Sequence, residues 1–371
     1  PVDGHNLHQL MRVFSEAKKL NHAVLVHVQT KKGKGYEFAE KHPCRFHGVE
    51  PFNIENGAPK IKKDKATYTD VFSNTICKIA EKNDKVVAIT AAMPDGTGLT
   101  KCGKLYPNRF FDVGIAEEHG VTFAAGLAAA GLKPVVAVYS SFLQRAYDQI
   151  IHDVCIQNLP VVFAVDRAGL VGSDGETHQG IFDLSFLTSI PNICVIAPKN
   201  KYELIDAMEF AMNYDYPIAI RYPRGAAFKG LKEFRAPISL GKSEIIAYEG
   251  DVALLALGSM VQTACEVREE LHKLGIRATV INMRFAQPLD YDIVHEISHS
   301  HSLVVTLEEN VISGGFGQKV STYISSKQYP NMTSINIGIP NVYVEHGNVD
   351  VLKKEFGIDK DGIVRKILDR M

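Results

Sequence analysis

The sequence predicts an α/β protein in which two domains, each built on a parallel or mixed sheet, follow a short remnant of a third domain. The first observation is that short apolar runs alternate with helix-like segments along most of the chain. Apolar strands joined through helices are typical of a parallel sheet covered on both faces. The second is size, because 371 residues suffice for two or three domains. The third is composition: 46% hydrophobic residues and a formal net charge of −1 are ordinary for a globular protein.

Residues 1–58 predict one helix and one strand. The polar residues 3–6 can cap a helix with apolar residues at helical spacing, namely Leu7, Leu10, Met11, Val13 and Phe14. Residues 23–28 are mostly apolar and predict a buried strand. One helix and one strand cannot enclose a core, so we expect this segment to dock on another part of the protein. The chain begins at the helix cap without an initiator Met, so we expect it to be a piece of a larger protein.

Residues 66–230 predict a complete α/β domain. Its expected strands are residues 86–89, 110–114, 134–139, 161–165, 192–197 and 217–221. Its expected helices are residues 68–79, 117–131, 142–157 and 201–212. Ligands of such folds bind at the carboxyl ends of the strands, and residues 172–180 form a glycine-rich turn that follows one of these strands.

Residues 236–371 repeat the pattern and predict a further domain. Its expected strands are residues 252–257, 278–282, 303–307 and 334–337, and its expected helices lie near residues 262–274, 291–299 and 317–326. The glycine-rich run at residues 314–317 precedes a helix and could cradle a phosphate. We favour a tight turn instead, because the full GxGxxG pattern is absent.

Charge, hydropathy and cysteine spacing exclude several classes of protein. A net charge near zero argues against binding to nucleic acid. No apolar run is long enough to span a membrane, because residues 121–138 are interrupted by two glycines, a lysine and a proline. The six cysteines are far apart and form no CxxC pair, so we expect thiols in a reducing compartment and no metal site.

The turn at residues 172–180 is the most informative feature of the sequence. Asp174, Thr177 and His178 offer a charge, a hydroxyl and a ring that titrates near neutral pH, which suits proton transfer on a polar small molecule. The alternative is a capped turn in which the glycines supply positive φ and His178 is incidental. From the turn alone, the two interpretations are evenly balanced.

Glu117 opens the helix at residues 117–131, directly after a predicted strand, so its carboxylate is expected at the ligand edge of the sheet. The alternative is that Glu117 only complements the helix dipole. The helix itself is rich in Ala and Gly and too apolar for a surface helix. We therefore expect it to pack closely against another helix, contributed by a second subunit.

Aromatic and basic residues follow other predicted strands. Tyr139, Phe142 and Arg145 are three residues apart, and an aromatic ring beside an arginine suits a flat heterocycle with an anion. Arg167 and Arg224 also follow strands, so they are expected to face one crevice that fits a phosphate or carboxylate. The alternative, common for such residues, is core packing for Phe142 and a surface ion pair for Arg145.

Taken together, these segments resemble the 1-deoxy-D-xylulose-5-phosphate synthases, which are thiamine-diphosphate enzymes of the transketolase superfamily. The resemblance runs the whole length of the chain and is carried by residues 30–37, 46–49, 111–119, 139–148, 166–171, 172–180 and 221–225. It implies domains of transketolase type: the pyrimidine-binding domain at 66–230, the C-terminal domain at 236–371, and at 1–58 the end of the diphosphate-binding domain. The family's Gly-Asp-Gly…Asn motif for Mg²⁺ and the diphosphate does not occur in this sequence. The Mg²⁺ ligands are therefore expected in a missing amino-terminal domain.

The resemblance also implies a reaction and a role for each residue. The family condenses pyruvate with D-glyceraldehyde 3-phosphate and releases CO₂. On the cofactor side, Glu117 would hydrogen-bond N1′ of the aminopyrimidine, Phe142 would stack on that ring, and Ile115 would contact the cofactor. Tyr139, Arg167 and Arg224 would hold the acceptor phosphate, and Arg145 would contact either that phosphate or the pyruvate carboxylate. The acceptor's hydroxyl and aldehyde would be handled by His47, Asp174 and His178, with both histidines catalytic.

The resemblance implies a homodimer, in a bacterial cytoplasm or a plastid, that is active only with the missing domain or with a separate amino-terminal chain. Three alternatives stay open. The chain could be the β subunit of a 2-oxo-acid dehydrogenase, although the turn at 172–180 and the segment 1–58 speak against it. It could be a transketolase, although the lead-in at 166–169 favours the synthase. It could also be an inactive piece that only dimerises.

Overall fold

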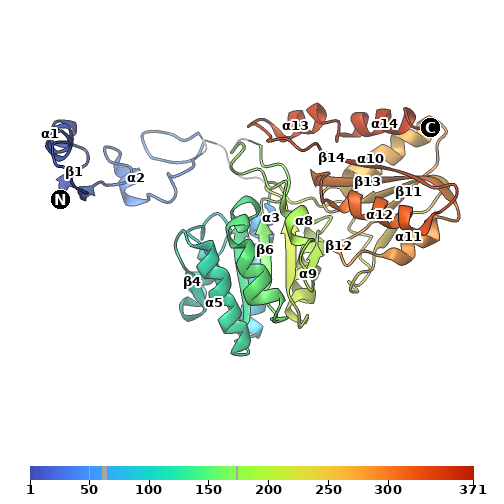
Figure 1. Ribbon diagram of the computed structural model, residues 1–371, viewed down its shortest axis with the longest axis horizontal. Helices are drawn as coiled ribbons and strands as arrows, with labels where there is room; N and C mark the ends of the chain where they lie inside the picture. Colours follow the sequence, from blue (N-terminus) through green and yellow to red (C-terminus); the bar gives the residue numbers. More distant parts are fainter. Residues whose placement is uncertain (50, 61–64, 173) are drawn as a thin grey trace. The chain divides into compact units, whose positions relative to one another are not determined.

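The computed structural model describes residues 1–49, 51–60, 65–172 and 174–371 of the chain. These residues fall into two compact units, Pro1–Asp64 and Lys65–Met371 (Figure 1). The larger unit holds both the second and the third predicted segment. The sequence boundaries at 58, 66, 230 and 236 stay predictions.

The smaller unit contains the predicted helix but not the predicted strand. Helix α1 (Leu7–Ala17) begins after Asn6, whose side chain accepts a hydrogen bond from the Gln9 amide. Strand β1 (Val2–Asp3) pairs in parallel with β2 (Val28–Gln29), and a short helix α2 (Glu37–Lys41) follows. The prediction of a buried strand at residues 23–28 was wrong, because β2 begins only at Val28 and Leu25 is 95% exposed. An apolar run becomes a buried strand only where a second layer covers it, and the described residues of this unit form no layer over that run.

The larger unit begins with the predicted parallel sheet. Its strand order is β12-β7-β8-β6-β5-β3-β4. The parallel strands are β3 (Val86–Thr90), β4 (Phe110–Asp112), β5 (Lys133–Tyr139), β6 (Val162–Asp166), β7 (Cys194–Ile196) and β8 (Ile218–Tyr222). Strand β12 (Phe285–Gln287) comes from the third segment and joins β7 antiparallel. The expectation of an α/β fold with a parallel or mixed sheet is confirmed.

Helices cover both faces of this sheet. One face is covered by α3 (Tyr68–Lys82), α4 (Thr100–Leu105) and α9 (Lys201–Met212). The other is covered by α5 (Glu117–Ala129) and by the segment after β5. That segment is not the continuous helix expected at 142–157. It consists of α6 (Ser140–Leu143), a 3₁₀ turn (Gln144–Ala146), α7 (Tyr147–Gln149) and a π-helical turn (Ile150–Cys155).

The π-helical turn has a packing reason. The Ile156 amide bonds to the Ile151 carbonyl at 3.0 Å, five residues back, which inserts one more residue per turn than an α-helix does. This spacing lets Ile150, Val154 and Cys155 all enter the core.

The third segment forms a five-stranded mixed sheet in the order β14-β13-β10-β11-β9. Its strands are β9 (Glu244–Ala247), β10 (Asp251–Ala256), β11 (Ala278–Asn282), β13 (His301–Val311) and β14 (Thr333–Ile339), with β9 antiparallel. One face is covered by α10 (Met260–Lys273), α13 (Val349–Glu355) and α14 (Lys360–Leu368), and the other by α11 (Tyr291–Ile297) and α12 (Phe316–Lys327). The side chains beneath α11 and α12 belong to the same apolar cluster as those beneath α5. The two sheets therefore share one core.

The glycine-rich run at 314–317 is a tight turn, as predicted. Gly314 has φ +70°, and α12 begins two residues later. The Glu308 carboxylate accepts hydrogen bonds from the amides of Phe316 and Gly317, both at 2.8 Å. An internal carboxylate thus occupies the helix amides that a phosphate cradle would need.

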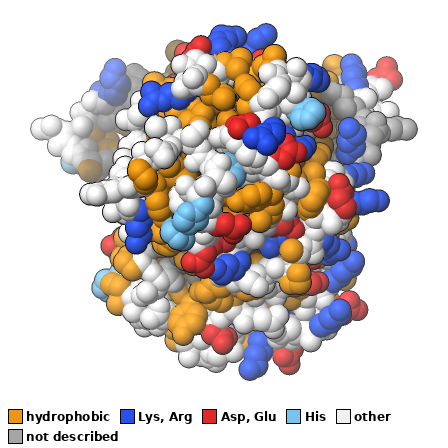
Figure 2. All heavy atoms as spheres, turned by 90° about the vertical axis from the view of Figure 1, so that its right-hand side faces the viewer, with side chains coloured by type: hydrophobic (Ala, Val, Ile, Leu, Met, Phe, Trp, Pro, Cys, Tyr) orange, Lys and Arg blue, Asp and Glu red, His pale blue; other side chains and the backbone are white. Residues whose placement is uncertain are grey.

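The described residues can be compared with the predictions about the cysteines, the membrane-spanning segments and the surface charge. Cys77, Cys102, Cys155 and Cys194 are buried free thiols, as the spacing predicted, whereas Cys44 is exposed. Among the helices of the described residues, none combines the length and apolar character needed to cross a bilayer. On the face drawn in Figure 2, basic and acidic side chains are interleaved with apolar ones.

Candidate functional site

Three predicted site residues of the larger unit lie at the carboxyl edge of the seven-stranded sheet. Tyr139 is the last residue of β5, Arg167 directly follows β6, and Arg224 lies two residues beyond β8. Tyr139 pairs with Asp166, and Asp166 pairs with Tyr222, so these three positions form one row across adjacent strands. The parallel register therefore brings the residues together, as strand-end positions in such sheets require.

Arg167 is held by a buried carboxylate and by a loop that sequence reasoning overlooked. Asp166 is fully buried, accepts a hydrogen bond from the Arg167 amide at 2.7 Å, and lies 3.1 Å from its Nη1. The Thr69 hydroxyl donates to the same carboxylate at 2.9 Å. Burial raises the pKa of Asp166, while Arg167 opposes that shift. Arg167 also has φ +60°, an uncommon conformation for a residue with a side chain. These contacts fix the direction of the guanidinium.

Arg167 and Tyr139 form one cationic, aromatic wall. The guanidinium lies 3.8 Å above the centre of the Tyr139 ring and donates from Nη1 to the Gly96 carbonyl at 2.7 Å. Its Nε is buried and has no hydrogen-bond partner among the described residues. Burial raises the pKa of Tyr139, partly offset by Arg167, so its hydroxyl stays protonated at neutral pH. The Nη2 of Arg167 makes no hydrogen bond within the described residues and is not fully buried, so it is the donor that an oxyanion can reach.

Three rings stand side by side in the site. Phe142 stacks on Tyr139 with ring centres 5.5 Å apart, and it meets the His178 ring edge-on at 5.1 Å. The Nδ1 of His178 lies 2.9 Å from the Thr177 hydroxyl. This arrangement fixes the imidazole between a hydroxyl and an aromatic face, and leaves its Nε2 without a partner among the described residues.

The turn at 172–180 has the predicted backbone and one contact that was not predicted. Gly172 and Gly175 have φ of +77° and +75°, so the glycines do supply positive φ. Ser173 lies outside the described residues. The Asp174 carboxylate pairs with Nη1 of Arg224 at 2.6 Å, and both side chains are about one third exposed. Asp174 and Arg224 were expected to act separately on the acceptor, but here each binds the other.

Glu117 is the first residue of α5, and its position matches the prediction of a carboxylate at the sheet edge. It is only 4% exposed, yet the described residues supply no hydrogen bond or ion pair to its carboxylate. Its neighbour Glu118 is exposed. Ile115, just before the helix, is 85% exposed. The carboxylate oxygens are not among the fully buried polar atoms without a partner, so the small exposed surface of Glu117 leaves its carboxylate accessible to a ligand at the sheet edge.

Two predicted residues are not brought into this cluster. Arg145 is exposed and has no hydrogen bond or ion pair within the described part of the chain. His47 belongs to the smaller unit, where its Nδ1 lies 2.6 Å from the Lys32 ammonium. Their roles stay predictions.

The loop at residues 93–98 is a part of the site that the sequence reasoning missed. A Cβ added at Gly96 would overlap the Tyr139 hydroxyl, so the loop backbone lies directly against that ring. The sequence could have predicted this loop, since the glycine-rich run Pro94-Asp95-Gly96-Thr97-Gly98 follows β3 at the same carboxyl edge. Thr69 and Asp166 carried no such signal, because their role depends on a contact between distant segments.

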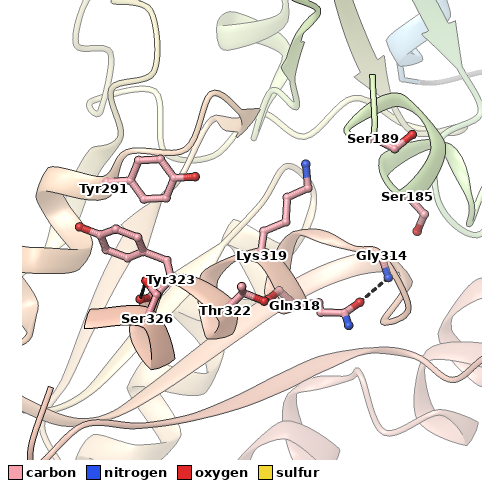
Figure 3. A pocket seen from close by; sticks show the side chains of 9 residues that line it. All are labelled: Ser185, Ser189, Tyr291, Gly314, Gln318, Lys319, Thr322, Tyr323 and Ser326. Atoms are coloured by element: carbon pink, nitrogen blue, oxygen red, sulfur yellow. Dashed lines mark hydrogen bonds between the residues drawn. The ribbon is translucent and has the colours of Figure 1, made fainter. Parts of the chain in front are cut away.

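A separate cavity of about 590 Å³ lies between α8 (Asp183–Leu187) and α12, and it contains none of the predicted site residues. Figure 3 shows that it is lined largely by hydroxyl groups, with Lys319 reaching across it and Gln318 accepting a hydrogen bond from the Gly314 amide. Within the described ranges, no group of three or more His, Cys, Asp or Glu side chains could hold a metal ion.

Two family models match the chain. "Transketolase, pyrimidine binding domain" covers residues 64–229 and "Transketolase, C-terminal domain" covers residues 241–363. Curated relatives include the 1-deoxy-D-xylulose-5-phosphate synthase of Lachnoclostridium phytofermentans, which is 57% identical over 367 residues, 99% of this chain and 59% of the relative. The synthase of Caldanaerobacter subterraneus is 51% identical over 370 residues, again 59% of the relative. The chain thus spans about three fifths of the length of these relatives.

Solved structures show the same fold. A chain described as "Split gene transketolase, inactive beta4 tetramer" aligns with a TM-score of 0.72 and 26% identity, over 82% of this chain and 98% of that one. The transketolase of Campylobacter jejuni aligns with a TM-score of 0.68 over 84% of this chain and 48% of that one. At 20% identity, the second likeness supports the fold alone.

Proposed function

Since the chain belongs to the 1-deoxy-D-xylulose-5-phosphate synthase family of the transketolase superfamily, we propose that it serves the reaction for which its relatives are named. In that reaction pyruvate loses CO₂, and the remaining two-carbon unit joins D-glyceraldehyde 3-phosphate to give 1-deoxy-D-xylulose 5-phosphate. Thiamine diphosphate, when bound, supplies the carbanion chemistry. The observation that carries the proposal is Glu117: the residue is only 4% exposed, yet its carboxylate stays accessible and has no hydrogen-bond partner in the described part of the chain.

The residues at the sheet edge fit the pyrimidine half of that cofactor. A ring nitrogen that shares a proton with Glu117 would supply the hydrogen bond that the carboxylate lacks. Phe142 offers an aromatic surface in the same edge region, and the exposed Ile115 offers an apolar contact. Glu117 would thus hold a proton at the cofactor, and Phe142 would orient the ring.

The arginines and the turn would bind the acceptor aldehyde. Arg167 has an Nη2 group without a partner among the described residues, and Arg224 can turn from Asp174 toward an incoming phosphate. His178 would donate or accept a proton at the aldehyde oxygen, and Asp174 would accept from a hydroxyl. His47 would complete this set, and Arg145 would meet a carboxylate or phosphate. We assign the Mg²⁺ and diphosphate contacts to the part of the relatives that this chain does not match, since the chain spans 59% of their length.

A homodimer is part of the proposal. The exposed face of α5 carries small residues, and a Cβ added at Gly126 would meet no atom within 4 Å. A helix from a second copy could therefore approach closely there. We infer a bacterial cytoplasm as the compartment, since the relatives are bacterial.

One observation favours an inactive state of this chain on its own. The solved split-gene chain that matches over 98% of its length is itself described as inactive. We therefore propose that activity needs the domain that holds the diphosphate, whether it is on the same polypeptide or on a separate chain.

Reconstitution tests both proposals. The chain is mixed with the part of the L. phytofermentans synthase that it does not match, and turnover is measured with pyruvate, D-glyceraldehyde 3-phosphate, thiamine diphosphate and Mg²⁺. We expect turnover from the mixture and none from either part alone. Glu117→Gln should lower kcat about 10²- to 10⁴-fold, whereas the matched control Glu118→Gln should change it less than about twofold. Near-normal turnover of Glu117→Gln would reject the assignment.

A further inference from the structure

The candidate site is built on the first sheet, but the segment that carries Asp174 and His178 is also hydrogen-bonded to the C-terminal domain. Residues 169–180 leave the sheet after β6 and return through the paired amides of Gly169 and Gly180. Within its own domain, Arg224 donates to the Val171 carbonyl at 3.4 Å and pairs with Asp174, and Phe142 contacts the His178 ring. The other hydrogen bonds of the segment reach β13 and the loop after β14.

Gln179 makes the first of these connections to the C-terminal domain. It is 2% exposed, and both ends of its amide are used. Its Oε1 accepts a hydrogen bond from the Val171 amide at 2.8 Å, which closes the turn on itself. Its Nε2 donates to the Glu345 carbonyl at 3.0 Å, which ties the turn to the loop after β14. The Gly347 amide adds a bond to the Gly172 carbonyl at 3.2 Å.

Glu309 makes the second connection. This buried residue of β13 accepts a hydrogen bond from the Leu170 amide at 2.8 Å and from the Ser259 hydroxyl at 2.9 Å. Its carboxylate is paired with Lys353 of α13 at 3.1 Å. Burial opposes the charge of Glu309, but Lys353 and these hydrogen bonds keep its pKa below the usual value. A charged acceptor thus holds the start of the turn.

The segment at 169–180 lies so close to the C-terminal domain that two of its positions require glycine. Gly169 has φ +86°, and a Cβ there would lie 2.7 Å from Glu309 Oε1. Gly172 has φ +77°, and a Cβ there would lie 2.7 Å from the Gly347 carbonyl oxygen. At Gly169 and at Gly172, therefore, the backbone lies too close to the C-terminal domain to leave room for a side chain.

We propose that the C-terminal domain is a positioning element of the candidate site, with Gln179 and Glu309 as the positioning residues that set where Asp174 and His178 stand. The consequence for the acceptor aldehyde rests on the function proposed above. Neither residue touches the substrate: each acts through the backbone of residues 169–180. The expected role is to hold the turn ready, so that binding of the acceptor need not order it.

Hydrogen exchange tests the positioning role without any need for turnover. In the 371-residue chain, Gln179→Leu removes both fastenings of Gln179, and we expect the amides of residues 170–171 and 347 to exchange about tenfold faster or more. The matched control Gln262→Leu removes a bond within α10 only and should leave these amides unchanged. Gln179→Glu keeps the acceptor for Val171 but loses the donor for Glu345. In Gln179→Glu the amide of residue 171 should therefore exchange as slowly as in the wild type, whereas the amide of residue 347 should exchange faster. This variant remains informative if Gln179→Leu does not fold.

Kinetics of the reconstituted enzyme separate this inference from the proposed function. We expect Gln179→Leu and Glu309→Gln to raise the KM for the aldehyde phosphate at least about tenfold, with the KM for pyruvate little changed. Unchanged exchange in both Gln179 variants would overturn the inference whatever the activity. Faster exchange with equal changes in both KM values would also overturn it, because the turn would then have only a structural role. Absence of turnover in the wild-type mixture would count against the proposed function alone, and exchange would still decide the inference.

Discussion

Replacing Lys199 with Met should destabilise the larger unit far more than loss of an ordinary surface charge. Lys199 lies in a buried ion cluster between α9 and the third segment, with Nζ 3.1 Å from Glu203 and 2.6 Å from Glu244. Arg284 neutralises the same two carboxylates at 2.7 and 3.0 Å. Asn282 adds a hydrogen bond to Glu203 at 2.9 Å. Two cations and two anions thus balance in a region that water does not reach.

The magnitude follows from burial. All four charged side chains are at most 6% exposed, so Lys199→Met leaves one carboxylate without a full counter-charge in a dry environment. Breaking a buried pair in this way costs about 3–5 kcal/mol. The matched control is Lys273→Met, since Lys273 bonds Glu270 at 2.9 Å while 67% exposed. Loss of such a surface pair costs under about 1 kcal/mol.

Urea unfolding of the 371-residue chain measures both changes. With a slope of about 3 kcal/mol/M, the midpoint of Lys199→Met should fall by about 1 to 1.7 M, and that of Lys273→Met by less than about 0.3 M. The double variant Lys199→Met with Glu244→Leu restores charge balance and should be more stable than Lys199→Met alone. Equal shifts for the two single variants, or a double variant less stable than the single, would refute the charge-balance reasoning.

Three further outcomes are expected. Burial opposes the charge of Glu244, but Lys199 and Arg284 hold its pKa in the folded chain below the usual range of a glutamate. The stabilisation from Glu244 is therefore present above the pKa of the unfolded chain and is lost as the pH falls through the lower folded pKa. Lowering the pH in urea unfolding should thus destabilise the wild type more than Glu244→Gln. Gly96→Ala should lower Tm and displace the Tyr139 ring. The control Gly120→Ala, whose added Cβ would meet only side-chain carbons at 3.4 and 3.8 Å, should leave Tm unchanged or slightly higher. Equal Tm values for both variants would contradict the close approach of the Gly96 backbone to Tyr139. In the reconstituted enzyme, Arg224→Ala should raise the KM for the aldehyde phosphate about 10- to 150-fold, with a smaller effect on the KM for pyruvate. Arg235→Ala, which changes an exposed arginine, serves as the control. Similar effects of Arg224→Ala on both KM values would indicate a structural role.

Much of the fold followed from local patterns. The apolar runs at β3, β5, β6 and β8 predicted buried parallel strands because a strand covered on both faces needs nearly continuous apolar residues. Residues 23–28 show where this reasoning ends. The run is similarly apolar, but no layer among the described residues of its unit covers it, and Leu25 is exposed. Burial depends on the partner surface as well as on the strand.

The sequence by itself determined the α/β class, the family, and the strand-end positions of Tyr139, Arg167 and Arg224, because parallel strands bring their carboxyl ends to one edge. Only the tertiary structure decided what holds those side chains. Thr69 reaches Asp166 across 97 residues of sequence, and Glu309 reaches the Leu170 amide across 139. Periodicity reports which face of an element is apolar, whereas such contacts depend on which distant elements meet. The pairing of Asp174 with Arg224 and the fastening of the turn to the C-terminal domain are of this second kind.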